Sequence, residues 1–370
     1  MKVIISGGGT GGHIYPALSI ADNLINRDKK TQILYIGTAS GLESSLVPER
    51  GYEFRAIRVK GFRRSLSTET VKSVIELIKG MGDAKRIIRE YKPDIVVGTG
   101  GYVAGPVLMV AFLRGVPTLI HEQNVLPGVT NRILSHFVGC VAVSFEEAVM
   151  RFKSKEKVVV TGNPIRTEIT RENRTGAIKK LGLSDKSPIV VSFGGSKGSD
   201  KLNTALVGVI EHLVREGGFQ LLHATGQDRY DGFMAALKSR NIKPEGCGDI
   251  KIMPYLHQMP EALAAADLVI TSAGAITIAE ITAIGLPAVL IPKSHAVDNH
   301  QEYNARALER KGAAVVLTEN ELKGDRLYKQ VSGLIKNKTL LSKMKQASKK
   351  MEKADAAEKI CDIIVEMVKR

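Results

Sequence analysis

Short apolar runs alternate with amphipathic segments along most of the chain, which is the pattern of repeated β–α–β units. In the first half this pattern predicts strands at residues 3–6, 32–36, 95–97, 118–120, 138–143 and 157–161. In the second half it predicts strands at residues 189–193, 220–223, 250–253, 268–270, 288–291 and 314–317. Helical periodicity covers residues 68–91 and the lysine-rich stretch 325–370. The chain is therefore predicted to be an α/β protein with two doubly wound parallel sheets.

Two of the predicted strands run directly into glycine loops. Residues 7–13 read Gly-Gly-Gly-Thr-Gly-Gly-His, and residues 194–198 read Gly-Gly-Ser-Lys-Gly. Glycine permits positive φ and a close approach of ligand, and the N-terminus of the next helix favours an anion such as phosphate. Further glycine loops follow later strands, at residues 98–102 and 272–275.

Ligands of open α/β sheets bind at the carboxyl ends of the strands. We therefore expect two Rossmann-like domains that face each other across a cleft holding two substrates. Gly162, Asn163 and Pro164 interrupt regular structure, which places the domains at residues 1–161 and 162–353. The final helix, about residues 354–370, is expected to pack back on the first domain.

Composition narrows the class of protein. No run of eighteen apolar residues exists, the N-terminus begins directly with a strand, and the three cysteines lie far apart. These features predict a protein that neither spans a membrane nor is exported. The net charge of +15 attracts polyanions or an anionic membrane surface. Few aromatic residues and no zinc-finger spacing argue against nucleic acid as a partner.

The positive charge is concentrated between residues 50 and 64. This stretch contains Phe62, Leu66 follows it closely, and the predicted helix 68–91 comes next. Its basic residues are Arg50, Arg55, Arg58, Lys60, Arg63 and Arg64. A basic rim around apolar side chains predicts docking on a membrane surface. The alternative is that the apolar face packs on the sheet and the cations are solvated.

Other nucleotide chemistries fit less well. Gly7, Gly9 and Gly12 satisfy GxGxxG, but the second strand ends at residues 35–38 without the acidic residue that a dinucleotide ribose requires. No Walker loop and no DxD pair is present, so we expect no cofactor and no metal. A departing diphosphate would be stabilised by helix dipoles and basic side chains.

Taken together, the motifs resemble one family over essentially the whole chain: the MurG family of N-acetylglucosaminyltransferases of bacterial peptidoglycan synthesis. The segments that carry the resemblance are residues 7–13, 98–106, 121–124, 162–166, 194–196, 274–280 and 298–301. Two positions depart from the family pattern. Ser272 stands where the family usually has arginine, and Lys197 stands where it has glutamine; the lysine is either a replacement charge or merely solvated.

The resemblance implies a GT-B fold and a transfer of N-acetylglucosamine from UDP-N-acetylglucosamine to lipid I, an undecaprenyl-diphosphate-linked N-acetylmuramoyl-pentapeptide. The C4 hydroxyl of the acceptor attacks the anomeric carbon with inversion, and the product is lipid II. Such an enzyme is expected to act peripherally at the cytoplasmic face of the cell membrane, with roles in cell-wall biogenesis, cell shape and division.

The resemblance also implies site residues. His13 is the favoured general base and Glu122 its rival. Donor contacts are expected from Thr10, Gly11, Gly12, Asn124, Arg166, Ser196, Leu256, Gly274, Ala275, Ile276, Thr277, Glu280 and Gln301. Gly100, Gly101 and Tyr102 are expected in the acceptor loops. Two residues have ordinary alternatives: Arg166 can form an ion pair at a domain interface, and Leu256 can belong to the core.

Three other functions stay open at this point. The first is a different GT-B transferase, with a diacylglycerol or natural-product acceptor. The second is a UDP-sugar epimerase, and the third is a non-catalytic basic adaptor for membranes or nucleic acid.

Overall fold

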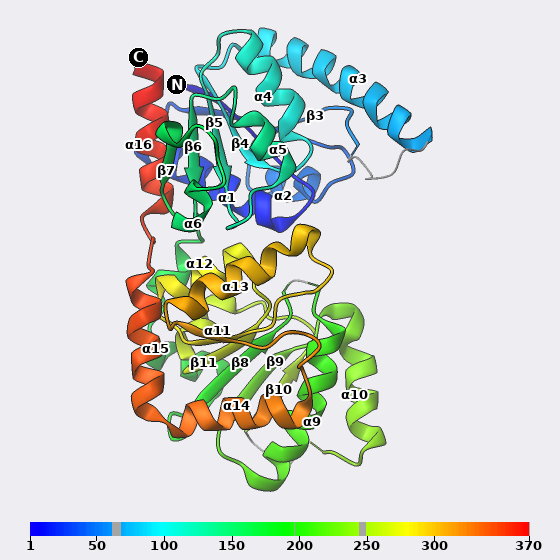
Figure 1. Ribbon diagram of the computed structural model, residues 1–370, viewed down its shortest axis with the longest axis vertical. Helices are drawn as coiled ribbons and strands as arrows, with labels where there is room; N and C mark the ends of the chain where they lie inside the picture. Colours follow the sequence, from blue (N-terminus) through cyan, green and yellow to red (C-terminus); the bar gives the residue numbers. More distant parts are fainter. Residues whose placement is uncertain (61–67, 196, 244–248, 370) are drawn as a thin grey trace. The chain divides into compact units, whose positions relative to one another are not determined.

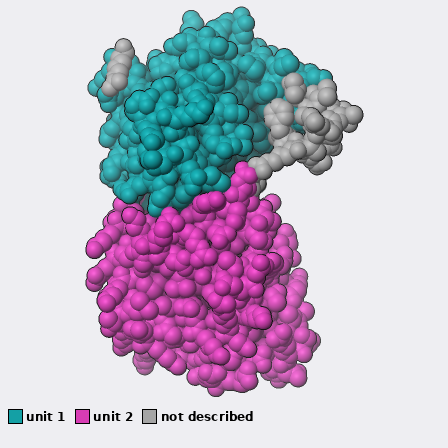
Figure 2. Space-filling model, in the orientation of Figure 1, with its two compact units in different colours: residues 1–165, 353–370 teal, residues 166–352 magenta. Residues whose placement is uncertain are grey.

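The computed structural model describes residues 1–60, 68–195, 197–243 and 249–369, without the side chains of residues 68–72, 74 and 297. The chain forms two compact units (Figure 2). Unit 1 comprises Met1–Ile165 and Lys353–Arg370, and unit 2 comprises Arg166–Glu352.

Unit 1 is built on a parallel sheet with the strand order β3-β2-β1-β4-β5-β6-β7. The strands are β1 (Lys2–Gly7), β2 (Gln32–Gly37), β3 (Glu53–Ala56), β4 (Ile95–Gly100), β5 (Thr118–Glu122), β6 (Cys140–Val143) and β7 (Val158–Val160). The chain reverses its direction of winding between β1 and β4. The carboxyl ends of these two strands therefore form the switch point at which doubly wound folds bind ligands.

Helices cover both faces of this sheet (Figure 1). They are α1 (Gly11–Arg27), α2 (Glu43–Glu49), α3 (Thr68–Tyr91), α4 (Ala104–Leu113), α5 (Val129–Leu134), α6 (Glu146–Val149), the short η1 (Lys155–Lys157) and α16 (Ala356–Lys369). Ile360, Cys361 and Ile364 of α16 are fully buried in the same core as Ile5 and Ile20. An ion pair of 2.6 Å between Arg27 and Asp362 joins the exposed sides of α1 and α16.

Unit 2 repeats the architecture with the parallel order β10-β9-β8-β11-β12-β13. The strands are β8 (Ile189–Phe193), β9 (Gln220–Ala224), β10 (Ile250–Met253), β11 (Leu268–Thr271), β12 (Ala288–Leu290) and β13 (Ala314–Val316). Its switch point lies between β8 and β11, by the same argument as in unit 1.

The helices of unit 2 again lie on both faces of its sheet (Figure 1). They are α7 (Glu168–Arg171), α8 (Arg174–Leu181), α9 (Asp200–Glu216), η2 (Gln227–Arg229), α10 (Tyr230–Ser239), α11 (Met259–Ala265), α12 (Ala275–Ala283), η4 (Val297–Asn299), α13 (His300–Arg310), α14 (Gly324–Lys336) and α15 (Lys338–Lys350). One face is buried by α9 and α14, whose side chains share a core with those of β8 and β9.

The prediction of two parallel α/β sheets is confirmed. Two local features differ from it. The sequence pattern missed β3, and the predicted helical stretch 325–370 is divided into α14, α15 and α16. Asn337 separates the first two, because its side chain accepts a hydrogen bond of 3.0 Å from the Leu340 amide and so caps α15. Among the described residues, no helix is long and apolar enough to cross a bilayer.

Candidate active site

The candidate site in unit 1 lies where the loops after β1 and β4 meet. Gly9, Gly100 and Gly101 all have positive φ, at 84°, 104° and 80°. A Cβ on Gly101 would lie 2.4 Å from the Gly8 carbonyl oxygen, so only glycine allows the two loops to pack this closely. The Tyr102 ring lies over Gly9, 3.6 Å from where a Cβ would stand.

His13 lies in the first turn of α1, after Thr10 as the N-cap residue. Its Nδ1 is 3.0 Å from the Thr99 carbonyl oxygen and 3.2 Å from Oε1 of Gln123. Both oxygens can only accept, so Nδ1 must carry the proton of the neutral ring. Nε2 then holds the lone pair, as a general base requires.

Glu122, the rival base, is 1% exposed at the end of β5. Its carboxylate accepts hydrogen bonds from the Asn124 amide at 2.9 Å, the Gly128 amide at 3.0 Å and Nδ2 of Asn131 at 2.8 Å. Through these hydrogen bonds Glu122 ties the loop of residues 124–128 to the end of β5. Glu122 therefore orders the loop that contains Asn124, and the choice between His13 and Glu122 as the base stays a prediction.

A carboxylate of the protein already occupies one side of the first glycine loop. Glu43 is fully buried, and it accepts hydrogen bonds from the Gly9 amide at 3.2 Å and from the Thr38 amide and hydroxyl at 3.0 and 2.7 Å. An anionic ligand would therefore have to approach the α1 N-terminus at Gly11, which is partly exposed, and at Gly12, which is exposed.

In unit 2 the second glycine loop connects β8 to α9. Gly195 and Gly198 have φ values of 83° and 73°, and a Cβ on Gly198 would lie 2.0 Å from the Thr225 carbonyl oxygen. Ser196, predicted to bind the donor, lies outside the described residues. Ser272, on the neighbouring strand-end loop, has its hydroxyl 3.6 Å from the position of a Cβ on Gly195.

Lys293, which the sequence reasoning missed, links this loop to Gln301. Its Nζ donates a hydrogen bond of 3.0 Å to the Gly198 carbonyl, and its backbone amide donates one of 3.0 Å to Oε1 of Gln301. Burial lowers the pKa of Lys293, and the nearby Arg229 lowers it further. A half-buried ammonium beside a glycine loop and the N-terminus of α9 is suited to bind a diphosphate.

Arg166, which is partly exposed, and Glu280, which is buried, form an ion pair within unit 2. Both Nε and Nη2 of Arg166 donate to the same Glu280 oxygen, at 2.9 and 2.7 Å. The Glu280 side chain is 4% exposed. Burial raises the pKa of Glu280, and the attraction of Arg166 opposes that rise.

The remaining donor-site predictions fall on α12 and on one buried side chain. Gly274 is the N-cap residue of α12, no side chain caps the helix, and Ala275, Ile276 and Thr277 form its partly exposed first turn. Amide groups of such a turn can donate to a ligand. Leu256 is 5% exposed, which favours ordinary packing over contact with a nucleobase.

The structure thus gathers the predicted residues into one cluster in each unit. The members in unit 1 lie at the carboxyl ends of β4 and β5, in the loops after β1, β4 and β5, or in the first turn of α1: Thr10, Gly11, Gly12, His13, Gly100, Gly101, Tyr102, Glu122 and Asn124. Arg166, Gly274, Ala275, Ile276, Thr277, Glu280 and Gln301 lie around α12 and α13 of unit 2. Sequence reasoning missed Glu43, Gln123 and Lys293, although Gln123 stands inside the 121–124 motif and Lys293 closely follows a strand.

The predicted basic cluster is largely paired where the structure describes it. Arg55 contacts Glu53 and Glu90 at 3.1 and 3.2 Å, and Arg50 lies 3.7 Å from Asp22. Arg58 is 2.7 Å from Asp83, and its hydrogen bonds lower the pKa of that carboxyl. Phe62, Arg63, Arg64 and Leu66 lie outside the described residues.

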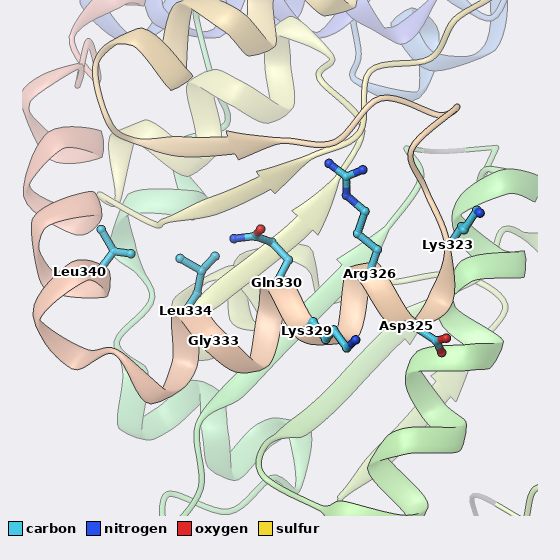
Figure 3. A pocket seen from close by; sticks show the side chains of 8 residues that line it. All are labelled: Lys323, Asp325, Arg326, Lys329, Gln330, Gly333, Leu334 and Leu340. Atoms are coloured by element: carbon cyan, nitrogen blue, oxygen red, sulfur yellow. The ribbon is translucent and has the colours of Figure 1, made fainter.

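A cavity of 540 Å³ lies along α14, apart from both clusters (Figure 3). Its lining residues are Lys323, Asp325, Arg326, Lys329, Gln330, Gly333, Leu334 and Leu340. None of the predicted site residues lines this cavity. The candidate site residues are therefore those of the two clusters.

Comparison with known proteins gives one family for both units. The glycosyltransferase family 28 N-terminal domain matches residues 3–143, and the C-terminal domain of the same family matches residues 189–360. A protein from Thermoanaerobacter sp. (strain X514) is 49% identical over 98% of this chain and 99% of its own length. An equally similar relative, from Acetivibrio thermocellus, matches over 100% of this chain and 99% of its own.

Both relatives are named UDP-N-acetylglucosamine--N-acetylmuramyl-(pentapeptide) pyrophosphoryl-undecaprenol N-acetylglucosamine transferase. The crystal structure of Acinetobacter baumannii MurG superposes with a TM-score of 0.78 at 29% identity, covering 99% of each chain. The predicted GT-B fold is thereby confirmed. The chain belongs to glycosyltransferase family 28 and, within it, to the MurG family of N-acetylglucosamine transferases.

Proposed function

We propose that the protein transfers N-acetylglucosamine from UDP-N-acetylglucosamine to the C4 hydroxyl of the N-acetylmuramoyl group in an undecaprenyl-diphosphate-linked pentapeptide, converting lipid I to lipid II. The observation that carries this proposal is the 49% identity over nearly the whole length of a transferase named for these substrates. Unit 1 would hold the acceptor and unit 2 the donor.

The reaction would be a single displacement with inversion. Nε2 of His13 takes the proton of the acceptor hydroxyl as its oxygen attacks the anomeric carbon, and the bond to UDP breaks with its electron pair on the phosphate oxygen. Lys293 and the N-terminus of α9 would neutralise the departing diphosphate without a metal or cofactor. Arg166, Glu280, Gln301 and the first turn of α12 would hold the nucleoside and sugar.

The test is a panel of nucleotide sugars, each combined with a soluble lipid I analogue, with UDP release measured in the presence of EDTA. The proposal expects release only from UDP-N-acetylglucosamine with the muramoyl acceptor. Release with diacylglycerol or natural-product acceptors instead would favour a different GT-B transferase. UDP release or sugar epimerisation without any acceptor would favour an epimerase, and no turnover with any pair would favour a non-catalytic adaptor.

Replacing Lys293 by methionine should weaken UDP binding about tenfold to a hundredfold, because a charge-assisted hydrogen bond contributes about 1.5–3 kcal/mol. Isothermal titration with UDP measures this without an acceptor. Since the pKa of Lys293 is lowered, UDP affinity of the wild type should also fall at alkaline pH earlier than for an ordinary lysine. Lys336→Met, at an exposed position of α14, is the matched control. Equal UDP affinity for both variants would remove Lys293 from the site.

The same function requires contact with a membrane, and one surface of unit 1 supports it. We define the apolar-basic patch as Phe112, Leu113, Arg114, Arg132, Ile133 and Phe137 on and beside α4 and α5. Its apolar members are 38–68% exposed, and the rings of Phe112 and Phe137 lie 5.5 Å apart. Exposed apolar side chains beside arginines suit an anionic bilayer, here the cytoplasmic face of the cell membrane.

The double substitution Leu113→Glu and Phe137→Glu should reduce binding to anionic vesicles by more than about tenfold, because each buried side chain contributes about 1.5–3 kcal/mol. Co-sedimentation with phosphatidylglycerol vesicles at low and high salt measures it, and the wild type should bind less at high salt. Val214→Glu, on α9, is the control for an added charge at an exposed apolar position. Equal loss in the control variant would count against the patch.

A further inference from the structure

Gln123 connects His13 to a second, completely buried histidine. It is 2% exposed, and its Oε1 lies 3.2 Å from Nδ1 of His13. Its Nε2 lies 2.6 Å from the Thr99 carbonyl oxygen and 3.1 Å from Nδ1 of His121. His121 Nε2, in turn, lies 3.0 Å from the Gly162 carbonyl oxygen.

The donor or acceptor character of each partner determines where the protons lie along this chain of contacts. The Gly162 carbonyl accepts only, so His121 carries its proton on Nε2 and accepts with Nδ1. Burial lowers the pKa of His121 to about 4, so its ring is neutral near pH 7. Gln123 must then turn its NH₂ group to His121 and to Thr99, which leaves Oε1 facing His13. The opposite amide orientation would set two acceptors 2.6 Å apart.

We propose that Gln123 is a positioning residue that fixes His13 in the Nδ1–H tautomer and so keeps the lone pair on Nε2. The inference rests on the proposed role of His13 as base. An amide is the uncharged group that can accept from one histidine while donating to another and to a backbone carbonyl. The oxygen of Thr99 accepts from both His13 and Gln123, which locks the two side chains to the same strand end.

Two buried carboxylates of unit 1 have hydrogen-bond partners outside this chain of contacts. Glu122 of β5 is engaged by the loop of residues 124–128, and Glu43 of α2 by Gly9 and Thr38. His121 is the titratable group joined to His13 through Gln123, and its Nε2 contacts the Gly162 carbonyl and, at 3.3 Å, the Ser144 hydroxyl. The contacts described for Nδ1 of His13 are those with Gln123 and the Thr99 carbonyl, and both require the proton on Nδ1.

Nitrogen NMR of the full chain with ¹⁵N-labelled histidine tests the proposal directly, because protonated and unprotonated ring nitrogens have distinct shifts. The chain has eight histidines, and His13→Ala identifies the signals of residue 13. At neutral pH the wild type should show Nδ1 protonated and Nε2 unprotonated. Gln123→Met leaves the Thr99 carbonyl to hold the Nδ1 proton, so the Nε2–H tautomer should gain population and kcat should fall about tenfold, with donor KM unchanged.

Gln123→Glu gives an independent reading if the methionine variant does not fold. A carboxylate still accepts from Nδ1 and so keeps the tautomer, but it stabilises the imidazolium and raises the pKa of His13. The acidic limb of the kcat profile should therefore move to higher pH. If Gln123 only stabilised the fold, the Gln123→Glu substitution would lower kcat by the same factor at every pH.

Gln220→Met is the matched control, since Gln220 is 1% exposed and makes three hydrogen bonds to residues 184 and 187 in unit 2. It should reduce thermal stability without moving the pH profile or the histidine signals. Unchanged ¹⁵N shifts in Gln123→Met, or an unmoved acidic limb in Gln123→Glu, would overturn the proposal. Failure of the proposed function would give a different result. The wild type would then release no UDP, while its histidine spectra would still show the expected tautomer of His13.

Discussion

His13→Ala is expected to lower kcat about 100- to 10,000-fold, the usual contribution of a positioned general base. UDP affinity should stay within about twofold, because the contacts proposed for the diphosphate come from the other unit. The physical reason is that Nε2 of His13 holds the lone pair while Nδ1 is committed to Thr99 and Gln123. Steady-state UDP release with a soluble acceptor, beside UDP titration, measures both quantities.

His212→Ala provides the control for the loss of a histidine. His212 bridges Glu216 and Asp325 at 2.9 and 3.0 Å on the surface of unit 2, so its loss should lower stability and leave kcat unchanged. An undiminished kcat in His13→Ala would transfer the role of base to another group, with Glu122 the first to examine. A parallel fall in UDP affinity would indicate general misfolding.

The second large effect is expected from Arg166→Met, which should lower the free energy of unfolding by about 3 kcal/mol near pH 7. The substitution leaves the carboxylate of Glu280 buried without its cation. Donor affinity should fall as well, since the first turns of α12 carry the proposed nucleoside contacts. Urea unfolding followed by circular dichroism measures the stability change.

The pH dependence of this loss follows from the direction of the Glu280 pKa. Burial already raises that pKa, and removing Arg166 removes the interaction that opposes the rise. When the pKa of a carboxyl is higher in the folded state than in the unfolded state, its contribution to stability is fully present below the unfolded-state pKa. That contribution is lost as the pH rises through the folded-state pKa. The defect of Arg166→Met should therefore be small in acid, where Glu280 is protonated in both states, and grow as the pH rises.

The double variant Arg166→Met with Glu280→Gln should regain most of the lost stability, because it removes the buried charge as well. Lys180→Met provides the comparison for an exposed ion pair, with Glu172 at 3.1 Å, and should change stability by less than about 1 kcal/mol. A defect of Arg166→Met that is the same at acidic and at neutral pH would mean that Glu280 is not the cause.

The predicted strands were found because parallel strands buried on both faces are continuous apolar runs. Residues 189–193 and 250–253 were placed with the same bounds as β8 and β10. β3 escaped prediction because Glu53–Ala56 is a short edge strand whose side chains are all partly or fully exposed. Its arginine and glutamate gave the segment the composition of a solvated surface.

The site was predictable where a loop motif is local in sequence and unpredictable where it depends on tertiary contact. The glycine loops could be located because glycine is required at positive φ. The partnership of His13 with Gln123 joins residues 110 positions apart, and that of Arg166 with Glu280 joins residues 114 apart. Neither hydrophobic periodicity nor motif spacing predicts contacts between residues so far apart in sequence. The contact that bears on the tautomer of His13 and the Arg166–Glu280 ion pair were therefore found only in the folded structure.

The return of α16 to unit 1 bears on how the protein is made. Ile360, Cys361 and Ile364 fill the core next to α1, so residues 1–165 alone leave an apolar surface uncovered. During translation that surface stays exposed until unit 2 and then α16 have emerged from the ribosome. The nascent N-terminal half is thus a natural client for chaperones, whereas unit 2, continuous in sequence, can complete its own core as it emerges.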